Sequence, residues 1–356
     1  MNEQIKEEVY KCSKCGQCQS VCPIYIATKN EMFLARGRYI VLNNSFKNNS
    51  KLTQQFIKNL DICLNCNACK RFCPSNLDAQ AIFTTLKSEY NYNFSVLPFP
   101  VIYKLLLNSM RILRYIYKYF PLKSIFKNSV ISSLFDVKIK RNKKEANTTK
   151  EKVVYFEGCI NKYINPSDKN AVLNILESLG YKVEKTVSNC CGLPYLSDGD
   201  YKSFNRNTEK IEKFLPDDIK YIVCSCDSCY ETLKNTRLSA KLIRLDELLY
   251  INNFPININE NMVFHKPINR SEEIHLPAKD INTKGVCTLA ENYFFIKHPV
   301  MTKAIFKEAF YKKEVLDNKI AVTTCQLALI GLKKGIREIE SKTQIYSLAE
   351  YIENKK

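Results

Sequence analysis

The residues of this chain best suited to chemistry are eight cysteines in two runs. Both runs follow the same spacing, C-x2-C-x2-C-x3-C-P, and they consist of Cys12, Cys15, Cys18, Cys22 and of Cys63, Cys66, Cys69, Cys73. Three thiolates separated by two residues each can close around one face of a cubane iron–sulfur cluster, and the fourth is carried away from it. The spacing therefore predicts two [4Fe–4S] clusters and one-electron transfer.

The fourth cysteine of each run is expected to reach the cluster of the other run, as in bacterial ferredoxins. The first cluster is then held by Cys12, Cys15, Cys18 and Cys73. The second cluster is held by Cys63, Cys66, Cys69 and Cys22. Zinc sites usually use two cysteine pairs, and disulfide frameworks belong to short secreted chains. Both alternatives therefore fit the spacing less well.

Five further cysteines lie in the C-terminal half: Cys159, Cys190, Cys191, Cys226 and Cys229. The adjacent Cys190 and Cys191 suit a single tetrahedral ion poorly, because neighbouring side chains diverge, but they suit an open cluster that bridges several irons. Gly192 would let the backbone approach that cluster closely. A zinc ion or an ordinary cubane on four of these cysteines stays an alternative. Cys224 is expected to be a buried small hydrophobe.

The composition is that of a globular protein of two or three domains, with 356 residues, 45% apolar residues, 9 Gly and 12 Pro. Sixteen cysteines without an export signal predict metal thiolates in a reducing cytoplasm. No apolar stretch is long enough to predict a membrane span. No Gly-rich dinucleotide fingerprint is present, which places a flavin or nicotinamide on another protein.

Hydrophobic spacing predicts an α+β multidomain fold with four segments. Residues 1–93 form an α-helical ferredoxin domain, with helices near 31–42 and 52–60. Residues 94–150 form a linker, and residues 151–252 and 253–356 form two α/β halves. Strands in these halves are expected at 153–156, 221–224, 262–264 and 320–323. Helices are expected at 167–179, 229–235 and 326–339.

The linker carries 12 basic and 2 acidic residues, more than half of the net charge of +18. Val101–Phe120 is predicted to be one helix, with Lys104, Arg111 and Lys118 along one stripe. Its apolar bulk and cationic stripe are typical of a helix on a membrane surface. A helix packed on the protein's own core or on a partner subunit is the commoner alternative. No nucleic-acid-reading module is visible, and no nucleic-acid partner is expected.

The pattern Cys…Cys-Cys-Gly…Cys-x2-Cys resembles the cysteine-rich (CCG) domain of heterodisulfide reductase subunits. The same domain occurs in iron–sulfur subunits of anaerobic glycerol-3-phosphate dehydrogenase and of glycolate or lactate oxidases. Residues 178–183, 190–194 and 198–200 are also similar. Several of these subunits share the whole order of two ferredoxin runs, a linker and two cysteine-rich halves. The resemblance implies a third, noncubane [4Fe–4S] cluster, held by Cys159, Cys190, Cys191, Cys226 and Cys229.

The two cysteine-rich halves are predicted to be an internal repeat. Residues 156–161 align with 264–269, with one residue absorbed, and Cys226 aligns with Cys325. The second copy keeps only Cys287 and Cys325 of five ligand positions, so we expect no cluster of its own. His265 together with Cys287 and Cys325 forms a candidate mononuclear zinc site. Plain core packing of these three residues is the alternative.

Three functions are compatible with these features. The first is an electron-transfer subunit that relays electrons from a flavoprotein dehydrogenase of the glycolate, lactate or glycerol-3-phosphate type towards membrane quinone. It is expected in the cytoplasm or attached to the inner face of the cell membrane. The second is a heterodisulfide-reductase-like catalytic subunit with disulfide chemistry at the CCG cluster, which the loss of the second ligand set disfavours. The third is a zinc-holding assembly component. Shared architecture implies the class of complex but not its substrate.

Overall fold

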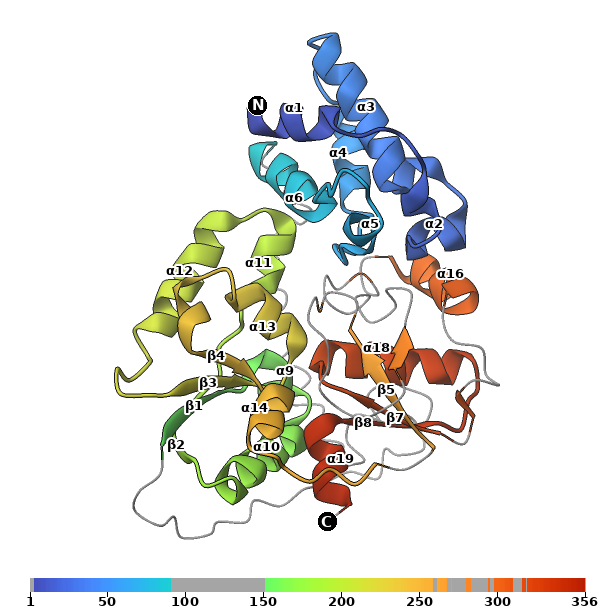
Figure 1. The fold of residues 1–356 in the computed structure, drawn as a ribbon. Coiled ribbons are helices and arrows are strands. Elements are labelled where there is room, and N and C mark those ends of the chain that lie inside the picture. Colours follow the sequence, from blue (N-terminus) through green and yellow to red (C-terminus); the bar gives the residue numbers. More distant parts are fainter. Residues whose placement is uncertain are drawn as a thin grey trace, which may run out of the picture.

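The computed structural model describes residues 3–90, 151–258, 261–267, 270, 280–282, 294, 298–309, 316–317 and 319–355. The predicted basic linker, with Lys104, Arg111 and Lys118, lies outside the described residues, as does Cys287. A helical part (residues 3–90) lies at one end of the molecule, above two sheet-containing halves that lie next to each other (Figure 1). None of the helices in the described ranges is long and apolar enough to cross a membrane.

The helical part packs short helices around an apolar core. Its elements are α1 (Glu3–Tyr10), the 3-10 turns η1 (Gln17–Gln19) and η2 (Glu31–Phe33), α2 (Pro23–Thr28), α3 (Ala35–Lys47), α4 (Gln54–Leu60), α5 (Ala68–Arg71) and α6 (Ala79–Glu89). Leu42, Leu60 and Leu86 are fully buried in the core. Thr53 and Asp78 cap α4 and α6, because their side chains accept hydrogen bonds from the first-turn backbone. These helices present the cysteine-bearing loops.

The helix predicted at 31–42 is interrupted. Residues Glu31–Phe33 form the separate turn η2, which begins where the Asn30 side chain accepts a hydrogen bond from the Met32 backbone. Leu34 then adopts an extended conformation, with φ −93° and ψ 150°, and its side chain is completely buried. Burial of this leucine ends one turn and redirects the chain, so that α3 begins only at Ala35.

The first half (residues 151–252) contains a parallel four-stranded sheet in the order β2-β1-β3-β4. Its strands are β1 (Lys152–Phe156), β2 (Lys182–Val187), β3 (Tyr221–Cys224) and β4 (Leu242–Arg244). Its helices are α9 (Gly158–Tyr163), α10 (Pro166–Ser178), α11 (Leu193–Asp198), α12 (Tyr201–Glu212), α13 (Asp227–Leu233) and α14 (Leu245–Ile251), with the 3-10 turn η3 (Arg237–Lys241). The apolar run in β1 is buried, as expected for a central parallel strand covered on both faces.

The second half (residues 253–356) repeats this order of strands as β6-β5-β7-β8. Its described elements are β5 (Met262–Lys266), β6 (Asp280–Asn282), β7 (Ile320–Thr323), β8 (Gln344–Ser347), α16 (Pro299–Ala309), α18 (Gln326–Glu338) and α19 (Leu348–Asn354). The α/β architecture predicted for the C-terminal region is thus confirmed, with parallel sheets in both halves.

The register of the two sheets corrects the alignment of the repeat by one residue. Tyr155 lies opposite Val223 in the first sheet, and Phe264 lies opposite Val322 in the second. Since Val223 and Val322 are equivalent, Phe264 corresponds to Tyr155, and His265 takes the place of Phe156. The two halves therefore align without an inserted residue from Tyr155 and Phe264 to Cys159 and its counterpart at position 268.

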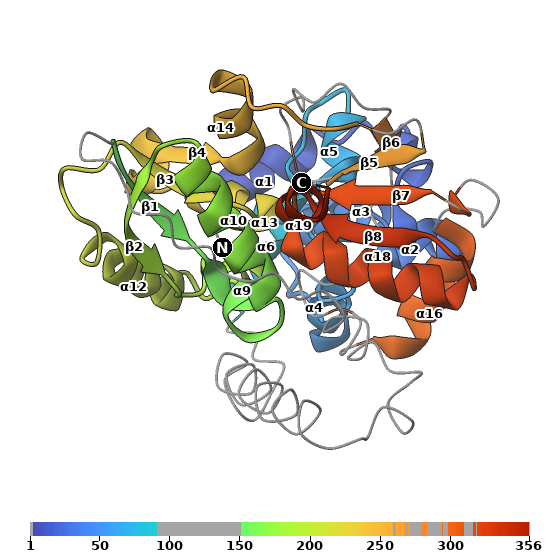
Figure 2. The ribbon, with the colours of Figure 1, turned by 90° about the horizontal axis from the view of Figure 1, so that it is seen from below.

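The two halves meet along α10 and α19, which lie between the sheets when the molecule is seen from below (Figure 2). Asp168 of α10 is completely buried there. Its carboxylate accepts hydrogen bonds from Asn161 Nδ2 at 2.6 Å, from Ser225 Oγ at 3.1 Å and from Ser347 Oγ of the second half. Burial, together with the charge of the neighbouring Glu350, raises the pKa of Asp168 from 3.8 to about 7.

We expect Asp168 to make the stability of the protein fall as the pH rises towards 7. The folded state keeps the proton when the unfolded chain has already lost it, so this stabilisation is present at low pH and disappears as the pH passes about 7. The contribution is about 2 kcal/mol between about pH 5.5 and pH 7. Asp168→Asn should weaken this dependence of the free energy of unfolding on pH. It should also lower the free energy of unfolding at acidic pH by roughly 1–3 kcal/mol, since one acceptor is lost.

Anaerobic urea unfolding of both proteins at several pH values measures this effect. If the free energy of unfolding depends on pH equally in Asp168→Asn and in the wild type, the Asp168 carboxyl is not the titrating group.

The helical part is fastened to both halves. Lys87 and Asp61 form a buried ion pair at 3.1 Å, and Lys87 Nζ also donates to the Ser197 carbonyl oxygen of the first half at 3.3 Å. Asp61 Oδ2 lies 3.6 Å from Nε2 of His298 in the second half. Gly199, at φ +78°, brings the first half so close to α6 that a Cβ would lie 2.4 Å from the Thr84 carbonyl oxygen.

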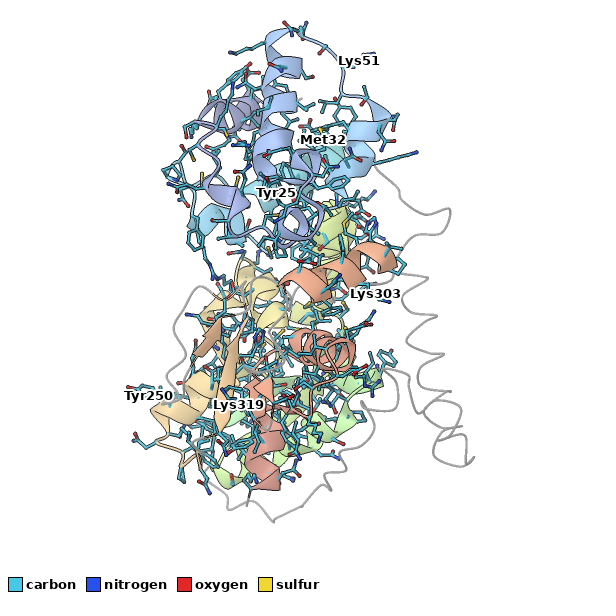
Figure 3. All side chains as sticks on the ribbon, turned by 90° about the vertical axis from the view of Figure 1, so that its right-hand side faces the viewer. Tyr25, Met32, Lys51, Tyr250, Lys303 and Lys319 are labelled. Carbon is cyan, nitrogen blue, oxygen red and sulfur yellow. The ribbon has the colours of Figure 1, made fainter. Side chains whose placement is uncertain are left out.

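A second contact joins α2 to α16 of the second half. Figure 3 labels Tyr25 on α2 and Lys303 on α16, one on each side of this contact. The three parts therefore form one continuous body around the cysteine sites.

Candidate iron–sulfur sites

The first cavity is a small, partly open space at the η1 loop. It is lined by the four cysteines predicted for the first cluster: Cys12, Cys15, Cys18 and Cys73. Cys15 is exposed to solvent, whereas the other three are partly buried. Four sulfurs around one partly open space fit a cubane with one edge at the protein surface.

The second cavity lies beside the first in the helical part. Its wall contains the four cysteines predicted for the second cluster: Cys22, Cys63, Cys66 and Cys69. Burial raises the pKa of Cys22 to about 11 and that of Cys66 well above its ordinary value. Thiolates at these positions therefore need the positive charge of iron to compensate their burial.

The structure thus brings the fourth cysteine of each run to the other run. Cys73 lies near enough to Cys12 to raise its pKa by charge repulsion, and Cys63 acts on Cys22 in the same way. The two cavities also share a wall, to which Ala35, Cys69 and Ala79 contribute. This placement fits the crossed ligand sets, and the ligation itself stays a prediction.

The CCG cavity is similar in extent to the other two. It is lined by the five predicted cysteines Cys159, Cys190, Cys191, Cys226 and Cys229, and also by Gln326 and Leu327 of the second half. Its size and its five sulfurs fit a multi-iron cluster. In the described ranges, no three His, Cys, Asp or Glu side chains are arranged to hold one metal ion together.

The five cysteines gather where the strands of the first half end. Cys159 lies in α9, directly after β1, and Cys226 and Cys229 lie at the start of α13, directly after β3. The carboxyl ends of parallel strands share one edge of the sheet, which is where such folds bind ligands. Cys190 and Cys191 precede α11, which begins after Gly192 at φ +97°.

The backbone at Gly192 was expected to approach the cluster closely. In the structure it closely approaches a side chain of the first half instead. A Cβ at this position would lie 2.7 Å from Cδ2 of Phe204.

Sulfur–sulfur contacts connect these thiols in series. Cys190 is placed to donate its thiol proton to Cys159 or Cys191, and Cys229 is placed to donate to Cys191 or Cys226. The thiols that accept these bonds have the lower pKa, so Cys191 and Cys226 are shifted well below the ordinary value and Cys190 and Cys229 well above it. Thiolate is the form of cysteine that binds metal.

Cys325 extends this series from the second half. Its Sγ lies 3.9 Å from Cys226 Sγ and 3.1 Å from Ser228 Oγ. The sequence pattern assigned Cys325 to a zinc site of the second half, with His265 and Cys287. His265 is buried, and burial lowers its pKa to about 3. Because Cys287 lies outside the described residues, that zinc site stays a prediction.

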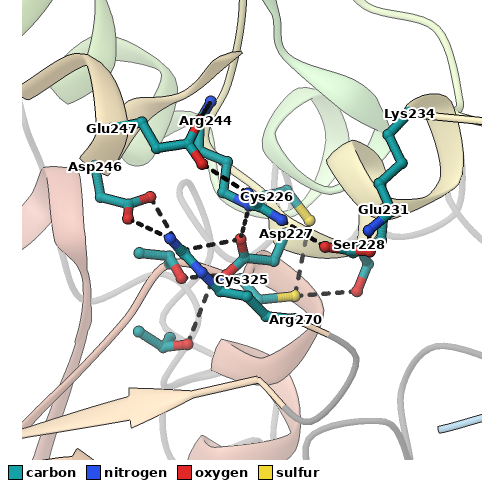
Figure 4. Close-up of polar contacts among 12 residues, drawn as sticks. Cys226, Asp227, Ser228, Glu231, Lys234, Arg244, Asp246, Glu247, Arg270 and Cys325 are labelled. Atoms are coloured by element: carbon teal, nitrogen blue, oxygen red, sulfur yellow. Dashed lines mark hydrogen bonds and ion pairs between the residues drawn. The ribbon is translucent and has the colours of Figure 1, made fainter. Parts of the chain in front are cut away.

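A buried cluster of charges lies behind Cys226, and sequence reasoning missed it (Figure 4). Arg244 Nε and Arg270 Nη1 donate to Asp227 Oδ1 at 3.0 and 3.3 Å, and Arg270 Nη2 donates to Asp246 Oδ2 at 2.7 Å. Arg270 belongs to the second half, so the cluster joins the halves. Two features of the sequence could have indicated this charge cluster. Asp227 directly follows Cys226, and Asp246 follows Arg244 after one residue.

The helical part continues directly into the CCG site. Ala68 and Cys66, which line the second cavity, pack in the same apolar core as Cys191, Cys226 and Cys229. The three cavities therefore form a row: the first shares a wall with the second, and residues of the second pack against the CCG cysteines. Cys224 is 2% exposed within this core, as expected for a buried small hydrophobe.

Comparison with protein families identifies two domains. Residues 8–77, which contain both cysteine runs, match the 4Fe-4S dicluster domain, and residues 153–234, which contain all five CCG cysteines, match the cysteine-rich domain. Neither the comparison with curated proteins nor that with solved structures returned a match. The chain therefore combines a 4Fe-4S dicluster domain with a CCG cysteine-rich domain, as iron–sulfur oxidoreductase subunits do, and these domains support a role in electron transfer.

Proposed function

We propose that this chain is an electron-transfer subunit with three iron–sulfur clusters. Two [4Fe–4S] clusters would be held by the crossed cysteine sets of the helical part, and a noncubane [4Fe–4S] cluster by the five CCG cysteines. The observation that carries this proposal is the row of three cavities, each lined by the cysteines predicted for one cluster. Bound iron–sulfur clusters supply one-electron transfer, with potentials set by burial and by hydrogen bonds to sulfur.

The order of the three cavities also indicates which end of the electron path a partner protein can reach. Cys15 gives the first cavity an edge at the surface, where a partner protein can dock. The sulfurs of the second cavity are all partly buried, and this cavity lies between the other two. The chain's residues would thus exclude water from the middle of the path and leave its outer end accessible.

The electron donor in this proposal is a flavoprotein dehydrogenase that oxidises a small hydroxy substrate, such as glycolate, lactate or glycerol 3-phosphate. The absence of a Gly-rich dinucleotide fingerprint supports a flavin on a separate subunit. The acceptor is membrane quinone, and the basic linker provides the membrane-surface or partner-docking segment.

Flavin analysis of the native complex, purified anaerobically from solubilised membranes, tests this proposal. We expect stoichiometric flavin that is bleached by one hydroxy acid and not by the others. The bleaching substrate then identifies the dehydrogenase partner. A complex with intact clusters but no flavin would contradict the proposal and would favour disulfide chemistry at the CCG cysteines.

A further inference from the structure

The CCG site contains a sixth thiol that the second half contributes. Cys325 is 1% exposed, and its Sγ lies 3.9 Å from that of Cys226 (Figure 4). It packs in the same apolar core as Cys191, Cys226 and Cys229. The second half therefore reaches the site of the first half, although it has lost most of its own ligand positions.

The fold fixes this contact from both sides. Cys226 and Cys325 occupy equivalent positions of the repeat, immediately before α13 and α18. The Asp227 backbone nitrogen donates to the Thr324 carbonyl oxygen at 3.3 Å, and the Thr324 hydroxyl donates to the Asp227 carboxylate. Arg270 holds the same carboxylate. The two helix starts therefore face each other with their cysteines in contact.

The neighbours of Cys325 determine what its thiol can do. Ser228 Oγ lies 3.1 Å from Cys325 Sγ, and the Cys325 thiol is also placed to donate to the Cys226 sulfur at 3.9 Å. Two thiolates at 3.9 Å in a buried site would repel each other, and a proton between them removes this repulsion. The five CCG cysteines already supply the ligands that the proposed cluster needs.

We propose that Cys325 remains a protonated thiol and donates a hydrogen bond to the Cys226 sulfur, which raises the reduction potential of the cluster in the CCG site. Cys325 is then a positioning residue that acts through Cys226. A hydrogen bond to a ligand sulfur stabilises the reduced, more negative cluster more than the oxidised one. The inference rests on the proposed function, because it requires iron in the CCG site.

The test is a redox titration of the full chain, followed by electron paramagnetic resonance and visible absorption. The signal that disappears in Cys191→Ala identifies the cluster of the CCG site. We expect Cys325→Ala to shift the midpoint potential of this signal to a lower value with unchanged iron content. Cys325→Ser, which keeps a donor, should stay close to the wild type. Cys224→Ala, which removes a thiol of similar burial, is the matched control and should leave the potential unchanged.

Two results would overturn the inference alone. An unchanged potential in Cys325→Ala would show that the thiol does not act on Cys226. Loss of iron from the CCG site in Cys325→Ala and Cys325→Ser would make Cys325 a ligand instead of a donor. Zinc instead of iron in the wild-type CCG site would overturn the proposed function, and metal analysis of the wild type reveals this before any variant is compared.

Discussion

Replacing Cys191 with alanine is expected to remove the cluster of the CCG site and to leave both cubanes in place. Cys191 is 4% exposed and lies in the middle of the series of thiols, in contact with Cys190 and Cys229. Its sulfur is part of the wall of the CCG cavity. Iron should fall from about 12 to about 8 atoms per chain, and turnover of the native complex should be lost.

Iron and sulfide analysis of the anaerobic protein measures this loss, and the resonance spectra of the cubanes serve as an internal reference. Cys224→Ala is again the control, since it removes a buried thiol from the same core. Unchanged iron and unchanged turnover in Cys191→Ala would instead support the zinc-holding assembly component.

The second large effect concerns the crossed ligands of the helical part. Cys22→Ala should destroy the cluster that the second run binds, because Cys22 lines the second cavity together with Cys63. Cys73→Ala should destroy the cluster of the first run, because Cys73 lines the first cavity together with Cys12. Each single variant is expected to lose about 4 irons.

Double variants distinguish crossed from uncrossed ligation. Cys22→Ala combined with Cys63→Ala removes two ligands of one cluster and should lose no more iron than either single variant. Cys22→Ala combined with Cys12→Ala affects two clusters and should lose about 8 irons. The opposite pattern of losses would show that each run binds its own cluster with all four cysteines.

Local sequence predicted the elements and the ligand groups well. Strands at 221–224 and 320–323 were predicted to the residue, because short apolar runs between polar segments fit buried parallel strands. Spacing predicted the cysteines that line the two cavities of the helical part, and the resemblance to the CCG domain predicted those of the third. The interrupted helix at Leu34 was missed because the capping by Asn30 and the burial of Leu34 outweigh helical periodicity there.

What the sequence did not reveal lies between segments that are far apart in the chain. The pattern of the repeat grouped Cys325 with His265 and Cys287 of the second half. Nothing in the sequence around Cys325 shows that it contacts Cys226. The pair Lys87 and Asp61 likewise looks like two ordinary surface charges in the sequence, yet both are buried where three parts meet. Periodicity and spacing describe elements, whereas these contacts depend on how finished elements pack together.

The close approach at Gly199 has a consequence for how electrons leave the protein. A backbone contact with no room for a methyl group, beside a buried ion pair, prevents the helical part from swinging relative to the first half. Some redox proteins carry electrons by moving a cofactor-bearing domain between two docking positions. This packing favours three sites at a fixed spacing over a cofactor domain that moves. Under the proposed function, the movement needed to receive and pass on electrons would then come from the partner proteins, which bind and dissociate.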